Sequence, residues 1–321
     1  MREALKLALI GFGNVGRELA RLLHERRAAY PFLITGIHTA RHGTAISRSG
    51  LPPDPVFGAP ATSVGSFLDA TGAQVMVELT SLNPTTGEPA IAHIRAAFAR
   101  GMHVVTANKG PIAHAYASLR DEAEDRGLRF RFESTVMDGA PVFNMVRNNL
   151  PGVRVLGFTG VLNSTSKVIV ETMERGGTFD EGVDAARKLG ITETDGTYDI
   201  EGWDSAAKTA ALANVFMDAG STPQSVSTRG IGRLTPERMQ ELARAGKTVR
   251  LVSRARRNSG RTSLRVRAEV LDKSDILAAV AGTSNLLLLH TDRMGTLGIV
   301  SISPTVRQTA YGVFIDLADL R

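Results

Sequence analysis

Residues 5–26 read LKLALIGFGNVGRELARLLHER, and this stretch decides the fold of the first half of the chain. An apolar run over residues 5–10 leads directly into three glycines, and apolar residues at helical spacing follow over residues 14–26. Gly11, Gly13 and Gly16 have the spacing of a loop that binds the pyrophosphate of a dinucleotide at a helix amino terminus. A plain glycine turn between strand and helix is the alternative. The motif predicts cofactor contacts from Gly11, Gly13, Asn14, Val15 and Gly16.

Strand and helix patterns alternate outward from this motif. Apolar runs predict strands over residues 32–37, 73–79, 103–107 and 129–133, and helical patterns cover residues 88–100 and 112–126. Residues 41–63 are polar and rich in proline and glycine, which indicates a long surface loop. The order predicts an α/β, Rossmann-type doubly wound domain with an open parallel sheet.

A second pattern begins after about residue 137. Strands are predicted over residues 153–162, 249–253 and 264–271, with helices between them, and an amphipathic helix closes the chain over residues 305–316. We therefore expect a dinucleotide-binding domain over residues 1–137, joined by the helical segment 303–321. Residues 138–302 are expected to form an α+β domain.

Residues near strand ends indicate the cofactor. No carboxylate occurs between Glu25 and Asp54, where an NAD site usually has an acid for the ribose. Arg41, assisted by His38, can instead hold a 2′-phosphate, so NADP is favoured and NAD stays open. Thr80 and Lys109 follow two other strands, at the sheet edge where ligands bind.

Composition limits the class of protein. The 321 residues are 43% hydrophobic and 22% charged, as in folded globular enzymes, and the net charge is +6. The basic run at residues 254–257 is interpreted as a solvated face. The sequence lacks a basic stripe with interleaved aromatic residues, so nucleic-acid binding is not expected. Cysteine is absent, which excludes disulfides and thiol catalysis. With no signal-peptide pattern and no apolar run long enough to span a bilayer, a cytoplasmic protein is expected.

Residues 186–208 read ARKLGITETDGTYDIEGWDSAAK. Asp204 and Lys208 are four residues apart and share a helix face; such a pair is usually surface decoration. The string, however, resembles the homoserine dehydrogenase signature D-[LIVM]-x-G-x-D-x-x-x-K, which begins here at Asp199. The segments TANKGPI (106–112), FESTVMDGAP (132–141) and GVLNSTS (160–166) extend the resemblance to about residue 218.

The resemblance implies an NAD(P)-dependent interconversion of L-homoserine and L-aspartate 4-semialdehyde, in threonine and methionine biosynthesis. By resemblance Lys208 transfers the proton, Asp204 is its acidic neighbour and Lys109 is a second active-site lysine, while Glu193 and Asp199 hold the amino group of a small amino-acid substrate. It further implies a homodimer, formed by the second domain. A monovalent cation, Na⁺ or K⁺, is expected at Glu133, Val136, Asp138 and Ala140.

Departures from the family pattern leave other readings open. Gly196 stands where proline is usual, and Met137–Asp138 lie in a segment that is commonly glycine-rich. Ser164 replaces a usual glycine and Lys167 a common asparagine, and the turn at residues 302–308 also differs. A dehydrogenase of the same fold acting on another small hydroxy or amino acid is one alternative, and a catalytically silent cofactor-binding protein is another. No regulatory domain is expected after Arg321.

Overall fold

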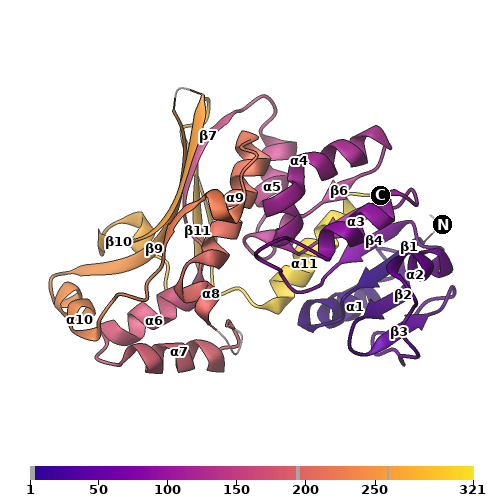
Figure 1. The fold of residues 1–321 in the computed structure, drawn as a ribbon, viewed down its shortest axis with the longest axis horizontal. Helices are drawn as coiled ribbons and strands as arrows, with labels where there is room; N and C mark the ends of the chain where they lie inside the picture. The colour runs from indigo at the N-terminus through magenta and orange to yellow at the C-terminus, as the bar shows by residue number, and fades with distance from the viewer. Residues whose placement is uncertain (1–3, 193–195, 259) are drawn as a thin grey trace. The chain divides into compact units, whose positions relative to one another are not determined.

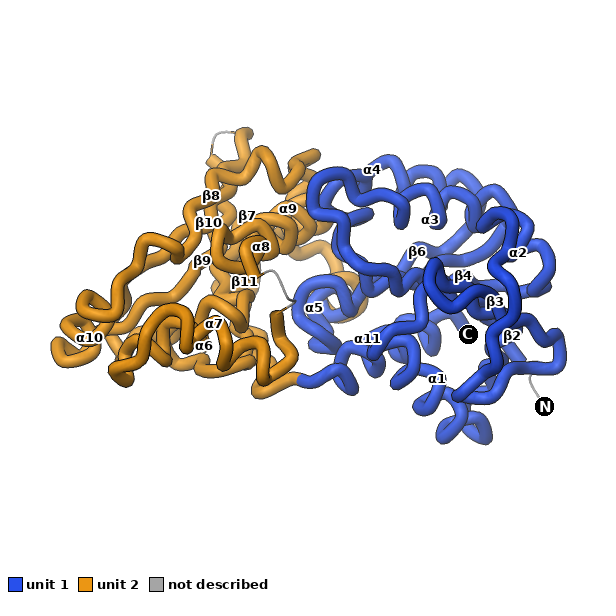
Figure 2. Tube along the Cα trace, turned by 60° about the horizontal axis from the view of Figure 1, so that its bottom comes forward, with its two compact units in different colours: residues 1–145, 305–321 blue, residues 146–304 orange. Residues whose placement is uncertain are grey.

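The computed structural model describes residues 4–192, 196–258 and 260–321, which form two compact units. Unit 1 comprises residues 1–145 and 305–321, and unit 2 comprises residues 146–304 (Figure 1, Figure 2). The domain boundaries that the sequence indicates, after residues 137 and 302, remain predictions. No helix among the described residues is both long and apolar enough to cross a membrane.

Unit 1 is built on a six-stranded sheet with the order β3-β2-β1-β4-β5-β6. Its strands are β1 (Leu5–Ile10), β2 (Phe32–Thr39), β3 (Gly43–Ile46), β4 (Val75–Glu78), β5 (His103–Thr106) and β6 (Phe130–Arg131). Its helices are α1 (Asn14–Arg26), α2 (Val64–Thr71), α3 (Ala90–Phe98), α4 (Lys109–Asp125), the short α5 (Val142–Asn144) and α11 (Val306–Ala318), with a 3₁₀ turn at Glu133–Thr135. The α/β prediction for this half of the chain is confirmed.

The expectation of an all-parallel sheet and of an unbroken loop over residues 41–63 was wrong. Strand β3 lies inside that loop and pairs antiparallel with β2, with Gly36 opposite Ile46, while the other pairings are parallel. The turn between the two strands ends at Gly43, whose φ of +88° suits glycine. A strand of only four residues that starts with glycine gives too weak a pattern to be found in a polar segment.

Helices cover both faces of the unit 1 sheet (Figure 2). Helix α1 turns Gly16, Leu19, Ala20 and Leu23 inward, a spacing of three and four residues that places all four on one face. The carboxyl-terminal helix α11 packs beside α1 and adds Ala310, Val313, Phe314 and Leu317 to the same core. The last residues of the chain therefore complete the core of the first domain, whereas α2, α3 and α4 pack on the strands from the other side.

Unit 2 is a second six-stranded sheet, with the order β12-β11-β7-β9-β10-β8. Its strands are β7 (Val155–Val161), β8 (Ser227–Arg229), β9 (Lys247–Asn258), β10 (Arg261–Asp272), β11 (Asn285–Thr291) and β12 (Thr296–Ser301). Its helices are α6 (Ser164–Glu174), α7 (Phe179–Lys188), α8 (Thr197–Ile200), α9 (Trp203–Met217) and α10 (Pro236–Arg244), with 3₁₀ turns at Pro223–Ser225 and Ile276–Ala278. A π-helical turn at Met145–Asn149 crosses the boundary between the two units. Strands β8, β11 and β12 were not anticipated from the sequence.

Helix α9 positions the signature residues because it is packed tightly against the sheet. Its alanines have no exposed surface, and their small side chains allow a close approach to β7, β9 and β10. The buried alanines are Ala206, Ala207, Ala210, Ala211 and Ala213. A helix held in this way presents its first two turns, and the functional groups on them, with little freedom to shift.

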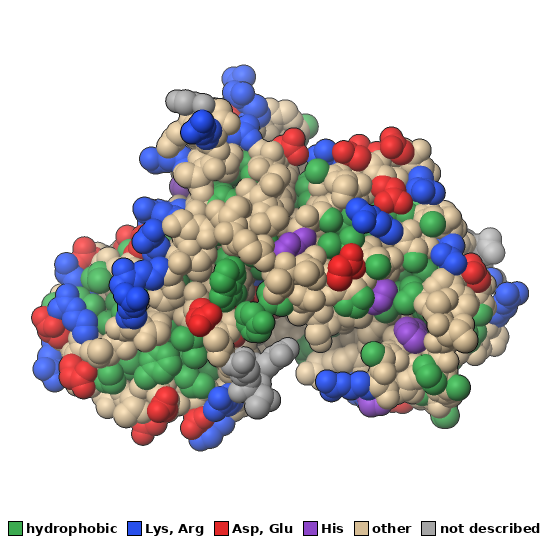
Figure 3. Space-filling model, viewed as in Figure 1, with side chains coloured by type: hydrophobic (Ala, Val, Ile, Leu, Met, Phe, Trp, Pro, Cys, Tyr) green, Lys and Arg blue, Asp and Glu red, His purple; other side chains and the backbone are tan. Residues whose placement is uncertain are grey.

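The basic run at residues 254–257 lies on β9. Figure 3 shows basic side chains gathered over the part of unit 2 that carries β9 and β10, with acidic side chains among them. Arg254 forms a two-pronged pair with Glu269 at 2.9 and 2.7 Å, Arg256 is exposed, and Arg257 donates a hydrogen bond to the Met217 carbonyl. These contacts fit the interpretation of the run as a solvated face with local pairs.

Candidate active site and cofactor site

The glycine loop joins β1 to α1. Gly11 has a φ of +95°, and a Cβ there would lie 2.6 Å from the Leu79 carbonyl oxygen, so only glycine fits between the ends of β1 and β4. Gly13 has nothing within 4 Å of a built Cβ, and no side chain caps the helix that follows. The open space at Gly13 and the uncapped N–H groups of α1 fit a pyrophosphate. Asn14, Val15 and Gly16 form the first turn of α1, as predicted.

A buried acid organises the carboxyl ends of β4 and β5. Glu78 has no exposed surface and accepts hydrogen bonds from the Thr80 N–H (3.2 Å), the Thr80 hydroxyl and the Thr106 hydroxyl (3.3 Å). Asn108 Nδ2 donates to the Thr80 carbonyl (3.1 Å), and its Oδ1 caps the helix of which half-buried Lys109 is the first residue. Thr80 and Lys109 are thus fixed at one edge of the sheet. Glu78 was missed from the sequence, although a carboxylate inside the apolar run VMVEL was a signal.

The end of β2 presents Arg41 rather than His38. Arg41 is exposed in the turn between β2 and β3. The His38 ring lies 5.4 Å from that of Phe67, and its Nδ1 is 2.8 Å from the Thr44 hydroxyl oxygen. Burial, and to a lesser degree the charge of His93, lower the pKa of His38. A lowered pKa favours the uncharged imidazole, so the exposed guanidinium of Arg41 is better suited than His38 to meet a 2′-phosphate.

The signature residues lie on α8 and α9. Gly202 joins the two helices with a φ of +90°, and Asp204 and Lys208 then occupy successive turns of α9. Lys208 Nζ is 3.0 Å from Asp204 Oδ2 and donates a hydrogen bond to the Leu162 carbonyl oxygen at 2.7 Å. The Asp204 and Lys208 side chains are 17% and 16% exposed, so the ion pair is mostly buried but still accessible.

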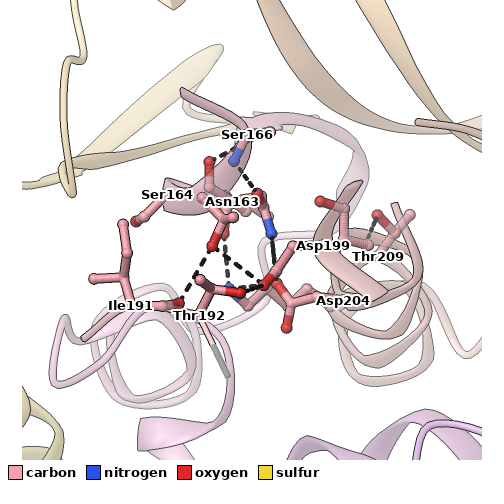
Figure 4. Close-up of polar contacts among 12 residues, drawn as sticks. Asn163, Ser164, Ser166, Ile191, Thr192, Asp199, Asp204 and Thr209 are labelled. Carbon is pink, nitrogen blue, oxygen red and sulfur yellow. Dashed lines mark hydrogen bonds and ion pairs between the residues drawn. The ribbon is translucent and has the colours of Figure 1, made fainter. Parts of the chain in front are cut away.

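Asp199 lies beside Asp204 and is held by neutral donors (Figure 4). Its Oδ1 accepts from Asn163 Nδ2 at 2.6 Å, and its Oδ2 accepts from the hydroxyls of Thr165 (3.1 Å) and Thr192 (3.2 Å). Burial is the main cause that raises the pKa of Asp199, and the negative charge of Asp204 raises it further. Glu193, the other predicted ligand of the amino group, lies outside the described residues.

The predicted cation segment follows β6 in unit 1. The carboxylate of buried Glu133 accepts the backbone N–H groups of Phe143 (2.8 Å) and Asn144 (2.6 Å), so it fixes the chain that follows. Asp138 has a φ of 55°, and its Oδ1 accepts from the Thr309 hydroxyl at 3.2 Å. Over the part of the chain that the structure describes, no group of three or more His, Asp or Glu side chains could hold a metal. A site made of backbone oxygens, such as those of Val136 and Ala140, remains a prediction.

Comparison with known proteins gives the family. Residues 11–133 match the model for the NAD-binding domain of homoserine dehydrogenase, and residues 141–318 match the model for homoserine dehydrogenase. The NAD(+)-dependent homoserine dehydrogenase of Pseudomonas canavaninivorans is 34% identical, over 97% of this chain and 95% of its own. The homoserine dehydrogenase of Methanocaldococcus jannaschii is 32% identical, over 98% and 97%.

Solved structures agree with the sequence relatives. The homoserine dehydrogenase of Thermoplasma acidophilum superposes with a TM-score of 0.84 at 25% identity, over 99% of both chains. That of Thiobacillus denitrificans gives 0.83 at 26% identity, over 99% of this chain and 73% of its own. Neither a silent binding protein nor a dehydrogenase for another substrate is favoured by these matches. The chain belongs to the homoserine dehydrogenase family and is an NAD(P)-dependent oxidoreductase.

Proposed function

We propose that the protein interconverts L-homoserine and L-aspartate 4-semialdehyde, with Lys208 as the group that moves the proton. The observation that carries this proposal is the Nζ of Lys208, held by the Leu162 carbonyl and by Asp204 at 2.7 and 3.0 Å and still partly exposed. The nicotinamide, when bound, exchanges a hydride with the alcohol carbon of the substrate. Oxidation of the alcohol then also requires a base for its hydroxyl proton.

Lys208 supplies that base in one direction and the acid in the other. In oxidation, neutral Nζ accepts the hydroxyl proton as the substrate carbon gives up its hydride. In reduction, the ammonium donates a hydrogen bond to the aldehyde oxygen and then transfers its proton to it. The ammonium is the ordinary form of lysine at neutral pH. Asp204 holds Nζ in place and balances its charge.

Carboxylates of the same segment recognise the substrate. Homoserine is a zwitterion, so its ammonium needs negative partners and its carboxylate needs N–H donors. We assign the ammonium to Glu193 and to Asp199, which lies next to the Asp204–Lys208 pair. Lys109, at the first turn of α4, is the second lysine that we assign to the active site.

The cofactor that we propose is NADP. Its extra phosphate would meet the exposed Arg41, and no carboxylate occurs from residue 26 to residue 53 to repel it. Replacing Arg41 with Ser should raise the KM for NADP about tenfold to a hundredfold and leave the KM for NAD unchanged, since a hydrogen bond to a charged group is lost. Arg48→Ser, which lies beyond the other end of β3, is the matched control. Equal KM changes for both cofactors would contradict the assignment, and so would a wild-type preference for NAD, the cofactor in the name of the Pseudomonas relative.

The assembly and the ion requirement complete the proposal. We propose a cytoplasmic protein that forms a homodimer through the unit 2 sheet. The exposed apolar residues Val300 (52% exposed) on edge strand β12 and Ile302 (79%) next to it support the contact between subunits. Sedimentation of the wild type should give twice the chain mass, and Val300→Lys should weaken the dimer. We also propose Na⁺ or K⁺ at the backbone oxygens near Val136, tested by replacing both ions with choline.

Initial rates decide the main proposal. Purified protein is assayed with homoserine and NADP or NAD, and with aspartate semialdehyde and the reduced cofactors. Turnover of both substrates supports the proposal. If neither substrate reacts and another small hydroxy acid does, the proposed substrate is wrong and that acid takes its place.

A further inference from the structure

Asn163 contacts both Asp199 and Asp204, although neither its residue type nor its position in the sequence had indicated a role. It lies between β7 and α6 and is 2% exposed. Its Oδ1 accepts from the Ser166 N–H at 2.7 Å and so caps α6. Its Nδ2 donates to Asp199 Oδ1 at 2.6 Å and to Asp204 Oδ2 at 3.2 Å (Figure 4). All of the side chain's polar atoms are therefore used.

The amide lies between two carboxylates that would repel one another. Asp199 comes from α8 and Asp204 from α9, and both aim an oxygen at the same nitrogen. An amide nitrogen has two N–H groups, so it can satisfy both acids, and it carries no charge. The oxygen of Asp204 that it contacts, Oδ2, is also the one that pairs with Lys208.

The backbone beside Asn163 acts on the same lysine. The carbonyl of the preceding residue, Leu162, accepts from Lys208 Nζ at 2.7 Å. Two adjacent residues thus fix both members of the pair, one through a peptide oxygen and one through a side-chain nitrogen. A shift of this junction would move Lys208 and Asp204 together.

We propose that Asn163 is a positioning residue for the reaction, which holds Asp199 and Asp204 at a fixed separation and keeps Asp204 turned toward Lys208. This rests on the proposed role of Lys208. Asn163 itself transfers no proton. Its loss should therefore lower turnover through the carboxylates, with little effect on cofactor binding.

The charges around Asp199 agree with this role. Burial and Asp204 raise the pKa of Asp199, while the hydrogen bond from Asn163, the charge of Lys208 and the hydrogen bond from Thr165 lower it. Helix α6 adds three more charged groups, Glu171, Glu174 and the buried Lys167, whose Nζ donates to the Asn163 carbonyl at 3.2 Å. Removing the amide donor should raise the pKa of Asp199 still further.

The variant Asn163→Asp separates positioning from capping. It has nearly the same shape and keeps an oxygen for the Ser166 N–H, but it presents an oxygen in place of the donor to Asp199 and Asp204. We expect kcat for semialdehyde reduction to fall about tenfold to a hundredfold at pH 8, from the loss of hydrogen bonds to charged groups. The ratio of variant to wild-type kcat should rise as the pH falls, because a protonated carboxyl regains a donor. The cofactor Kd should stay unchanged.

A second variant tests the contact between Asn163 and Asp199 by a measurement that does not depend on catalytic turnover. Asn163→Ser keeps a hydroxyl that can cap α6 but cannot donate to both carboxylates. The titration of the Asp199 carboxyl is followed by ¹³C NMR of protein labelled at aspartate, and its signal is assigned by its loss in Asp199→Asn. In Asn163→Ser this carboxyl should titrate at higher pH than in the wild type. Thr235→Ala is the matched control, because it removes only the cap of α10 and should alter neither the titration nor kcat.

The outcomes are distinct. Turnover of Asn163→Asp within threefold of wild type at every pH, or an unchanged Asp199 titration in Asn163→Ser, would overturn the inference. If the wild type does not act on homoserine or the semialdehyde, the proposed function fails, whereas the titration still decides whether Asn163 controls the carboxylates.

Discussion

Replacing Lys208 with Met removes the ammonium and keeps most of the apolar stem. General acid–base transfer contributes about 10²–10⁴-fold to a rate, so kcat in both directions should fall by that factor, or about 3–5.5 kcal/mol. Asp204 would lose its charged partner at 3.0 Å but keep the bond from Asn163. The Leu162 carbonyl would also lose its donor. The free energy of unfolding should therefore fall by about 2–6 kcal/mol, the usual effect of losing two hydrogen bonds made by a charged group.

Initial rates, the cofactor Kd and urea unfolding of the same preparation separate these effects. Lys247→Met is the control, since Lys247 also faces an aspartate, Asp272 at 3.9 Å, but on an exposed strand end. It should leave kcat unchanged. A Lys208→Met enzyme that retains kcat within threefold, while folded and able to bind cofactor, would refute the reasoning.

Four further substitutions test other parts of the structure. Gly11→Ala should destabilise the protein, because its Cβ would meet the Leu79 carbonyl at 2.6 Å, whereas Gly13→Ala should leave Tm unchanged and raise the cofactor Kd; a Tm loss for Gly13→Ala would contradict this. The pKa of Asp199 is raised on folding, so its stability contribution is present at low pH and is lost as the pH rises above the ordinary carboxyl value; the Tm of Asp199→Asn relative to wild type should therefore increase with pH, and a constant difference would argue against it. Glu133→Ala leaves two buried N–H groups without their acceptor and should cost about 2–6 kcal/mol in urea unfolding; a loss under 1 kcal/mol would show that water replaces the carboxylate.

Local patterns predicted the first half of the fold well. The helix over residues 14–26 has the predicted bounds, since its apolar spacing and glycine start are both encoded within one segment. Strand β3 was missed because four residues give little pattern, and β11 and β12 because no turn motif marked them. Tertiary pairing decides such strands, so sequence alone underdetermines them.

The site was predicted in part. The spacing of Asp204 and Lys208 places both on one helix face, and the structure gives the ion pair at 3.0 Å. Asn163 could not be found in this way, because it contacts Asp204 across 41 residues of sequence. Asp199 was expected to hold the amino group of the substrate, and the structure adds three hydrogen bonds that its oxygens accept from the protein, which no local pattern reveals.

The most direct test of the account is the transfer of deuterium from homoserine labelled at its alcohol carbon. In a single turnover with NADP, the wild type should place one deuterium on C4 of the nicotinamide and release labelled semialdehyde, and Lys208→Met should do so at least a hundredfold more slowly, the lower limit expected for loss of acid–base transfer. Deuterium that stays on homoserine, or equal rates for the two proteins, would contradict the central claim.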